Sequence, residues 1–384
     1  MDFFNDDTKY VANTYKRFPL ALTRGKGSLV YDENGKEYID MSTGIAVNSF
    51  GLCDNDWVEA VTNQAATLQH TSNLYYSAPQ IELAKLLCEK SGMTRVFFSN
   101  SGAEANECAI KTARKYAEMH TPDKKVIVTL VNSFHGRTVT TLSATGQDHF
   151  HTNFGPFTEG FRYAQANNID ALKAEISKND VCAVMFELIQ GEGGVMPLNQ
   201  EYVDGLVKLA KENNLLLIVD EVQTGNGRTG AMYCYQNYGF MPDIVSTAKG
   251  LGGGLPIGAT LFSEKTADVL TYGDHGSTFG GNPVCAAGAV SVVKRLDEAL
   301  FEEIKKKGAY LKEEISKIKG VKSVSGMGFM LGITTEKPAP DCVKACMDNG
   351  LLVITAKDKV RLLPALNITW EQLEKAVEIM KISF

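Results

Sequence analysis

Apolar runs alternate with amphipathic stretches through the middle of the chain. Several runs are apolar at almost every position, as in VCAVMFE and LLLIV, rather than at every second position. Strands that helices cover on both faces have this pattern. With helical stretches such as AEANECAIKTARKYAEM between them, the runs predict an α/β fold with a doubly wound, mostly parallel sheet. The predicted strands are residues 95–98, 125–130, 181–187, 215–219, 243–247 and 258–262.

The pattern changes after Pro283. A long helical run over 284–318 is followed by short apolar runs, by a helix near 341–349 and by a final helix from Thr369. This mixture predicts a smaller α+β domain at the C-terminal end.

The N-terminal residues are expected to join that smaller domain. GSLVYDENGKEYIDM reads as a β-hairpin with its turn at Asn34 and Gly35, because Asn-Gly favours tight hairpin turns. The predicted parts of the chain are an N-terminal segment (1–44), a large domain (45–284) and a small domain (285–384).

Composition narrows the class of protein. The 384 residues are 44% hydrophobic and 22% charged, and the net charge of −6 favours neither nucleic acid nor an anionic membrane as partner. The start MDFFNDDTKY lacks the basic and apolar stretches of a signal peptide, and the run 215–219 is too short to cross a bilayer. Eight scattered cysteines without a CxxC framework read as free thiols and predict no metal site. We therefore expect a cytoplasmic protein.

Two predicted strands end in chemically active residues. In LLLIVDEVQTG, Asp220 follows the most apolar run, and a carboxylate at such a position needs a positive partner. Lys249 ends the next predicted strand, so both side chains are expected at one rim of the sheet. A helix cap or a structural ion pair is the alternative for Asp220 taken alone. We interpret the glycines of GLGGG, directly after Lys249, as space beside a bulky cofactor.

Two loops add an anion site and an aromatic ring. In FFSNSGAEANE, a turn over 99–102 precedes a helix from Ala103, and backbone N–H groups at such a turn can bind phosphate. An ordinary N-cap is the alternative. In SFHGRT, Phe134, His135 and Arg137 could stack on a flat ring and grip a carboxylate, or His135 could be a loop histidine with internal partners.

Together these four features predict pyridoxal 5'-phosphate as the ligand. Asp220 would keep the pyridine nitrogen protonated, and Lys249 would form the resting imine and then carry a proton. That role needs a partly neutral amine, so burial must lower the pKa of Lys249. No G-x-x-x-x-G-K-[ST] or G-x-S-x-G string occurs in the chain. A G-x-G-x-x-G/A fingerprint starting at Gly250 fails, because Leu255 stands in sixth place.

At this point the chain resembles the class III pyridoxal-phosphate-dependent aminotransferases. The resemblance covers almost the whole chain in the family's order. It implies the type I fold of these enzymes and a homodimer with shared active sites at the subunit interface. The strings that carry the resemblance are HTSNLYY, FFSNSGAEANECAIKTARKY, SFHGRTVTTLSATG, IQGEGGVMP, LLLIVDEVQTGNGRTG, PDIVSTAKGLGGGLPIGA, GDHGSTFGGNP and VRLLPAL.

For the cofactor, the resemblance implies that Lys249 is the Schiff-base lysine and that Asp220 is the partner of the pyridinium nitrogen. It places Gln223 beside the ring hydroxyl and Phe134 on the face of the ring. The residues expected at the phosphate are Ser101, Gly102 and Ala103, with Thr278 contributed by the second subunit.

For the substrates, the resemblance implies two binding modes. Arg137 and Ser277 match positions that hold an acylated ornithine, and Arg361 matches the arginine that grips the α-carboxylate of glutamate. Glu192 matches the carboxylate that pairs with Arg361 while the other substrate is bound, as a buried arginine requires. The expected reaction moves the δ-amino group of N2-acetyl-L-ornithine to 2-oxoglutarate. It yields N-acetyl-L-glutamate 5-semialdehyde and L-glutamate, in arginine biosynthesis.

Three positions depart from the family pattern. FGLCDNDW (50–57) stands where members often have Gly-His-x-His-Pro, and Leu188 replaces the usual proline before IQGEGG. Ornithine aminotransferases tend to have a tyrosine near Gly44, so the glycine favours an N-acylated donor. Succinylornithine, succinyl-diaminopimelate, ornithine and 4-aminobutyrate stay open as donors. A non-catalytic binding protein and a pyridoxal-phosphate mutase are the alternatives from other classes.

Overall fold

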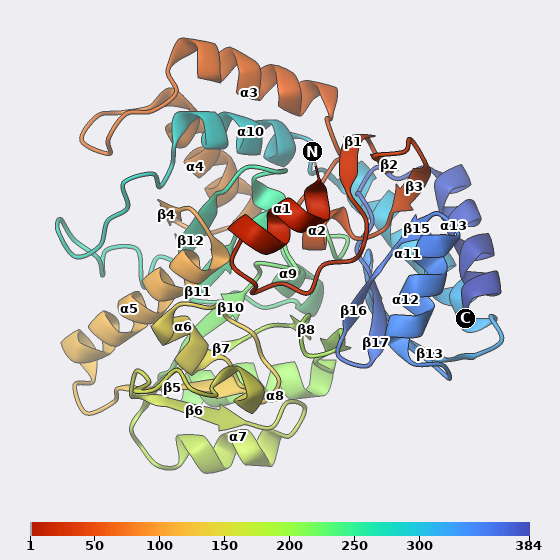
Figure 1. Cartoon of the computed structure of the whole chain (residues 1–384). Coiled ribbons are helices and arrows are strands. Elements are labelled where there is room, and N and C mark those ends of the chain that lie inside the picture. The colour runs from red at the N-terminus through yellow and green to blue at the C-terminus, as the bar shows by residue number, and fades with distance from the viewer. Residues whose placement is uncertain (1) are drawn as a thin grey trace.

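In the computed structural model, which describes residues 2–384, a seven-stranded sheet forms the centre of the larger part of the chain (Figure 1). Its strands pair in parallel except β12, which runs antiparallel to both of its neighbours. The predicted α/β fold with a mostly parallel sheet is therefore confirmed. In spatial order the strands are β4 (Arg95–Ser99), β12 (Gly258–Phe262), β11 (Ile244–Thr247), β10 (Leu216–Asp220), β7 (Val181–Phe186), β5 (Val126–Leu130) and β6 (Phe161–Ala164).

The apolar runs are the central strands of this sheet. Every residue of β7 and β10 is buried, because neighbouring positions belong to cores on opposite faces. Leu216 and Ile218 pack in the core under α5 (Gly102–His120), and Leu217 and Val219 pack in the core on the other face. The edge strand β6 was not predicted from the sequence, because its FRYA segment is only partly buried and has no continuous apolar run.

Helices surround the large sheet and continue beyond it. The predicted helical run over 284–318 is two helices, because Asp297 accepts a hydrogen bond from the backbone N–H of Leu300 (2.9 Å) and starts a new helix. The first of these helices, α10, packs against α3 and α4. No helix within residues 2–384 is long and apolar enough to cross a membrane. The helices around and beyond the large sheet are α3 (Asn55–Thr67), α4 (Ala78–Ser91), α6 (Val139–Ala144), α7 (Ile169–Ile176), α8 (Gln200–Glu212), α9 (Cys234–Tyr238), α10 (Pro283–Lys294) and α11 (Glu298–Ser316).

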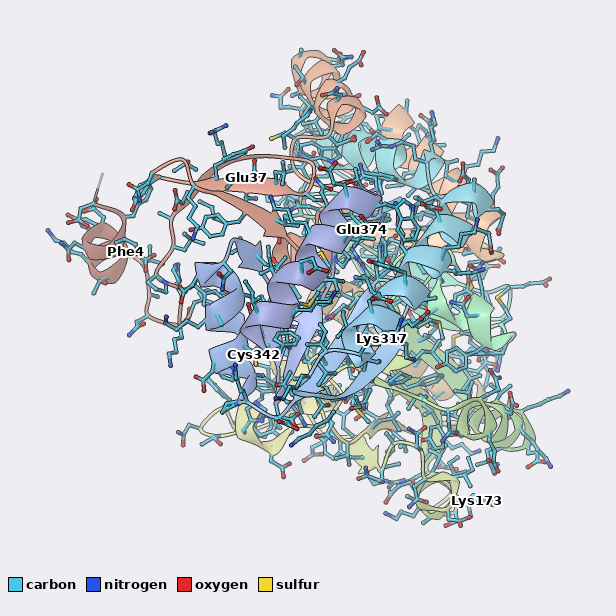
Figure 2. All side chains as sticks on the ribbon, turned by 90° about the vertical axis from the view of Figure 1, so that its right-hand side faces the viewer. Phe4, Glu37, Lys173, Lys317, Cys342 and Glu374 are labelled. Atoms are coloured by element: carbon cyan, nitrogen blue, oxygen red, sulfur yellow. The ribbon has the colours of Figure 1, made fainter. Side chains whose placement is uncertain are left out.

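A second, four-stranded antiparallel sheet lies in the C-terminal part, with strand order β13-β14-β17-β16. Figure 2 shows the helices that cover it, with Cys342 on α12 and Glu374 on α13. The eight cysteines of the chain are free thiols, and Cys342 and Cys346 share the buried face of α12. The elements are β13 (Val321–Met327), β14 (Met330–Thr335), β16 (Ile354–Ala356), β17 (Lys359–Leu362), α12 (Ala339–Asp348) and α13 (Trp370–Ser383).

The N-terminal strands join the C-terminal part, as Figure 1 shows by the contact of red and blue segments. The hairpin of β2 and β3 turns at Asn34 and Gly35, and β3 then pairs in parallel with β15, with Ile39 opposite Leu351. The division of the chain at residues 44 and 284 stays a prediction. The N-terminal segment contains α1 (Phe3–Tyr10), β1 (Leu22–Lys26), β2 (Leu29–Asp32) and β3 (Glu37–Asp40). The strand β15, which pairs with β3, is Leu351–Leu352.

Candidate active site

A cavity of about 650 Å3 opens at the carboxyl ends of β10 and β11, beside the turn from β4 to α5. Ligand sites in open α/β sheets lie at this edge, where the loops of several parallel strands converge. The cavity brings the four predicted features together. The predicted site residues that line it are Ser101, Gly102, Ala103, Phe134, Arg137, Asp220, Gln223 and Lys249.

The carboxylate of Asp220 ends β10 inside this cavity and is 4% exposed. Three donors hold it: the side-chain amide of Asn106 (2.8 Å), Nδ1 of His135 (2.8 Å) and the backbone N–H of Val222 (3.0 Å). Polar partners of this kind stabilise a buried negative charge. The carboxylate is therefore a fixed acceptor at the cavity wall.

His135 and Asn106 both contact Asp220 in this site. Neither contact was predicted from the sequence. The amide of Asn106 also donates to the carbonyl oxygen of His135 (2.8 Å). Nε2 of His135 is buried and has no hydrogen-bond partner in the described chain, so the interpretation as a loop histidine with internal partners explains one ring nitrogen only. The available signal was weak: Asn106 is a polar residue on the buried face of an amphipathic helix.

Lys249 begins a 3₁₀ turn one residue after the end of β11 and has a φ of 47°, in the left-handed region. Burial lowers the pKa of its amine, while the carboxylate of Glu192 opposes this shift. The direction is the one that the predicted role of Lys249 requires.

Most of the glycines after Lys249 make room for neighbouring protein groups and not for a cofactor. A Cβ at Gly250 would lie 2.7 Å from Oγ of Ser49, and a Cβ at Gly252 would overlap the carbonyl of Leu255. Only Gly254 of this cluster lines the cavity. The interpretation of the cluster as space beside a cofactor is therefore wrong for most of its members, because neighbouring backbone and side chains already fill that space.

The turn before α5 is both an N-cap and a candidate anion site. Oγ of Ser101 accepts from the backbone N–H of Glu104 (3.2 Å), and the carbonyl of Ser101 accepts from Ala105 (3.0 Å). No acceptor within residues 2–384 bonds to the N–H groups of Gly102 and Ala103, which line the cavity. A Cβ at Gly102 would lie 2.7 Å from Val222, so a side chain here would displace the wall of the cavity. Two free N–H groups at a helix start fit a phosphate.

Phe134 and Arg137 lie at the mouth of the cavity. The guanidinium of Arg137 stacks over the ring of Phe150 (4.1 Å to its centre) and lies 5.5 Å from the ring centre of Phe134. Arg137 is exposed, so its charge is available to a ligand. The pair presents an aromatic face and a cation to the same space.

Glu187 is a second buried carboxyl group that sequence reasoning missed. It follows β7, the neighbour of β10, and it accepts hydrogen bonds from the backbone N–H groups of Phe134 (2.9 Å) and Gly191 (3.2 Å). Burial raises its pKa to about 7. The signal was in the sequence, because Glu187 ends a fully apolar run as Asp220 does.

Arg361 is buried beside the cavity and forms an ion pair with Glu192, whose side chain is partly exposed. Its Nη1 lies 2.7 Å from Oε1 of Glu192 and donates to the side-chain oxygen of Gln223 (3.1 Å). Burial opposes ionisation of Glu192, but the charge and hydrogen bond of Arg361 outweigh it and hold the pKa of Glu192 below its usual value. Nε of Arg361 has no partner within the described residues. Gln223 lines the cavity and thereby connects it to the pair.

Ser277 and Thr278 lie on the loop between β12 and α10, outside the wall of the cavity. Oγ of Ser277 accepts from the side-chain amide of Asn100 (3.1 Å), which does line the cavity. Thr278 is exposed. Within one chain, the structure thus brings Ser277 close to the site and leaves Thr278 facing outward.

Gly44 lies in a left-handed turn labelled α2 (Thr43–Ala46), which follows β3. All four residues have positive φ, between 48° and 65°. A Cβ at Gly44 would make only ordinary contacts, 3.7 Å or more from Asn48 and Val47. Val47 lines the cavity, whereas Gly44 is exposed beside it.

The chain is similar to proteins of one family over nearly its full length. The family profile described as Aminotransferase class-III matches residues 10–383. The acetylornithine aminotransferase of Haemophilus ducreyi is 50% identical over 377 residues, which are 97% of this chain and 96% of that protein.

Solved structures agree with this similarity. The N-acetylornithine aminotransferase of Stenotrophomonas maltophilia superimposes with a TM-score of 0.84 at 37% identity and covers 96% of both chains. An ornithine aminotransferase of Toxoplasma gondii, with PLP at partial occupancy in its active site, has a TM-score of 0.94 at 34% identity. That match covers 100% of this chain and 93% of the Toxoplasma chain.

Proposed function

The chain belongs to the class-III aminotransferases, and we propose that it moves the δ-amino group of N2-acetylornithine to 2-oxoglutarate with pyridoxal 5'-phosphate as cofactor. The products are N-acetylglutamate 5-semialdehyde and glutamate, which places the reaction in arginine biosynthesis. One observation carries the proposal: Lys249 and Asp220 line one cavity, and Gln223 in the same cavity wall accepts a hydrogen bond from Arg361, which is paired with Glu192.

The residues of the cavity fit pyridoxal 5'-phosphate. The free N–H groups of Gly102 and Ala103 suit its phosphate, the carboxylate of Asp220 suits its ring nitrogen, and Phe134 offers a flat apolar face. When bound, the cofactor supplies an aldehyde that accepts an amino group and a ring that draws electrons from the neighbouring carbon.

Asp220 and Lys249 are proposed to do the proton chemistry. Asp220, held by Asn106 and His135, keeps a negative charge that favours a proton on the ring nitrogen opposite it. The amine of Lys249, with its lowered pKa, exchanges a proton with the substrate carbon that bears the amino group. Asp220 is held by its hydrogen bonds before substrate enters, which lowers the cost of reorganisation.

The Arg361–Glu192 pair is proposed to let one site hold two substrates. With 2-oxoglutarate or glutamate, Arg361 binds the α-carboxylate and Glu192 moves aside. With the amino donor, Glu192 stays on Arg361 and neutralises it, since an unpaired buried guanidinium is costly. The α-carboxylate of the donor then binds Arg137, which faces the mouth of the cavity, together with Ser277.

We also propose a homodimer that completes the site. Thr278, expected at the phosphate of the neighbouring subunit, lies on a surface rich in exposed apolar side chains, and a soluble monomer rarely exposes so many. The large exposed side chains before α4 and around Thr278 are Leu74, Tyr75, Tyr76, Tyr272 and Phe279.

A donor panel tests the proposal. The protein is reconstituted with pyridoxal 5'-phosphate, and kcat/KM is measured for acetylornithine, succinylornithine, ornithine and 4-aminobutyrate with 2-oxoglutarate as acceptor. We expect acetylornithine to be the best donor. The highest value for ornithine would contradict the role of Gly44, and failure of every donor would contradict amino transfer by this site.

Borohydride labelling tests the cofactor site independently of turnover. Reduction of the reconstituted protein is expected to attach pyridoxal 5'-phosphate covalently to the peptide that contains Lys249. The Lys249→Ala variant should give no such adduct, whereas Lys357→Ala, which removes an exposed lysine, should label normally. Labelling elsewhere with none at Lys249 would refute the assignment.

A further inference from the structure

The loop between β10 and α9 contains buried polar side chains that the proposed chemistry does not use. Asn226 and Arg228 are both 2% exposed. The loop includes the spacing G-x-G-x-x-G at Gly225, Gly227 and Gly230, but these glycines approach other protein groups, such as Leu366 at Gly227. The spacing is therefore a packing device here and not a dinucleotide site.

Asn226 holds the strand that leads into Lys249. Its side-chain amide donates to Oγ1 of Thr247 (3.0 Å) and to the carbonyl oxygen of Ala248 (3.2 Å). Ala248 is the residue directly before Lys249. The amide thus fixes the backbone from which the amine projects.

Arg228 holds the segment that follows Arg361. Its Nη1 donates to the carbonyl oxygen of Pro364 and approaches that of Phe329 (3.4 Å), and the backbone N–H of Phe329 donates to the carbonyl of Arg228 (2.9 Å). Gly328 has a φ of 54°, and a Cβ there would lie 2.7 Å from the carbonyl oxygen of Arg228. The two chains are therefore in close backbone contact.

The charge of Arg228 is unusual for its surroundings. No carboxylate pairs with it among residues 2–384, and burial lowers its pKa to about 9. Burying a guanidinium without a counter-charge is costly, and an apolar side chain of similar length would fill the volume without that cost. The arginine instead supplies directed N–H donors to backbone carbonyls, which fixes the geometry of the segment it contacts.

Ser49 connects the same two segments of backbone that Asn226 and Arg228 connect. Oγ of Ser49 donates to the carbonyl of Gly250 (2.7 Å), and the carbonyl of Ser49 accepts from the backbone N–H of Leu366 (2.7 Å). The backbone next to Lys249 and the backbone after Arg361 are thus tied together by two separate segments of the chain.

We propose that Arg228, with Asn226, is a positioning residue that sets the distance between the amine of Lys249 and the guanidinium of Arg361, and so selects dicarboxylates of five carbons. The inference rests on the proposed function, in which Arg361 binds the α-carboxylate of 2-oxoglutarate and glutamate. The acetylornithine half-reaction does not use Arg361 as a ligand. Arg228 therefore affects one half-reaction and spares the other.

The test compares Arg228→Met, which removes the donors, with Arg228→Lys, which retains a cation. Lys307→Met is the matched control, because Lys307 is also a buried cation that donates to a carbonyl, that of Ile368 (2.7 Å). Single-turnover rates are measured for acetylornithine and for the acceptors oxaloacetate, 2-oxoglutarate and 2-oxoadipate. Calorimetry measures the binding of glutarate, which cannot react.

For Arg228→Met we expect KM for 2-oxoglutarate to rise and glutarate affinity to fall, each about tenfold or more, since small misplacements of binding groups have effects of this size. The preference for 2-oxoglutarate over its shorter and longer homologues should fall by about fivefold or more, while the acetylornithine half-reaction stays within about threefold. Arg228→Lys should recover part of the loss, and it decides the question alone if Arg228→Met does not fold.

Equal losses in both half-reactions, or an unchanged length preference in both Arg228 variants, would overturn the inference. The same result in Lys307→Met as in Arg228→Met would also overturn it, because the effect would then be general destabilisation. A wild-type protein that transfers no amino group would instead contradict the proposed function, so the two failures are distinguishable.

Discussion

The guanidinium of Arg361 lies 2.7 Å from the carboxylate of Glu192, and the two partners differ in how firmly they are held. Arg361 is 2% exposed on strand β17, whereas the side chain of Glu192 is 29% exposed on a loop. In the proposed function, a substrate carboxylate that competes for the arginine would therefore displace Glu192, because the side chain of Arg361 is enclosed by protein and that of Glu192 is not.

Glu192→Gln should affect the two half-reactions unequally. The neutral amide no longer cancels the charge of Arg361, so acetylornithine should react about tenfold or more slowly, as expected when a buried charge loses its partner. The glutamate half-reaction, in which the substrate supplies the counter-charge, should change little. Stopped-flow measurement of both half-reactions checks this, and equal losses would refute the exchange of partners.

The same pair predicts a pH-dependent stability. The pKa of Glu192 is lowered in the folded protein, so the pair stabilises the fold at neutral pH and the contribution is lost as pH falls through that pKa. At pH 7, Glu192→Gln should be less stable than wild type by about 1–3 kcal/mol. Urea unfolding should show this difference shrinking between about pH 5 and pH 3. A difference that grows towards acid pH would contradict the assignment.

Asp220→Asn should slow the chemistry without unfolding the protein. The amide has the same shape but lacks the charge that favours a protonated ring nitrogen, so kcat should fall about 100- to 1000-fold. Asp243→Asn is the control: Asp243 is another carboxylate beside the same sheet, bonded to the backbone N–H of Leu217 (2.8 Å) but outside the cavity. Steady-state rates with acetylornithine compare the two, and similar losses would remove the special role of Asp220.

Gly44→Tyr should move donor preference from acetylornithine towards ornithine. A tyrosine beside Val47 would occupy the space expected for the acetyl group and would offer a hydroxyl to a free amino group. Because Gly44 has a φ of 63°, any side chain adds strain of about 1–2 kcal/mol, so Gly44→Ala is measured alongside to separate strain from specificity. The ratio of kcat/KM for the two donors is the readout. An unchanged ratio in Gly44→Tyr would exclude the position from donor selection.

The central fold was predictable because strands that are buried on both faces are apolar at almost every position. All six predicted strands are present, since each contains an apolar run: five lie inside the sheet, and β4, at one edge, is partly buried. The edge strand β6 and the break at Asp297 were not predictable from apolar periodicity. An edge strand needs no continuous apolar run, and a helix break depends on one capping hydrogen bond.

Single residues of the site were predictable where chemistry places them at strand ends. Asp220 and Lys249 line one cavity as their positions imply. Contacts between distant residues were not predictable, because spacing says nothing about them: His135 and Asp220 are 85 positions apart, and Arg228 and Pro364 are 136 apart. The roles assigned to these residues stay predictions for experiment.

The parallel pairing of β3 with β15 also bears on how the protein is made. Ile39 leaves the ribosome long before Leu351, the residue that it faces in the finished sheet. At ~5–20 residues per second, the N-terminal strands wait on the order of half a minute for the last strand of their sheet. During translation these residues therefore expose an unpaired edge, and the nascent chain depends on the large domain, or on a chaperone, to keep them from pairing with other chains.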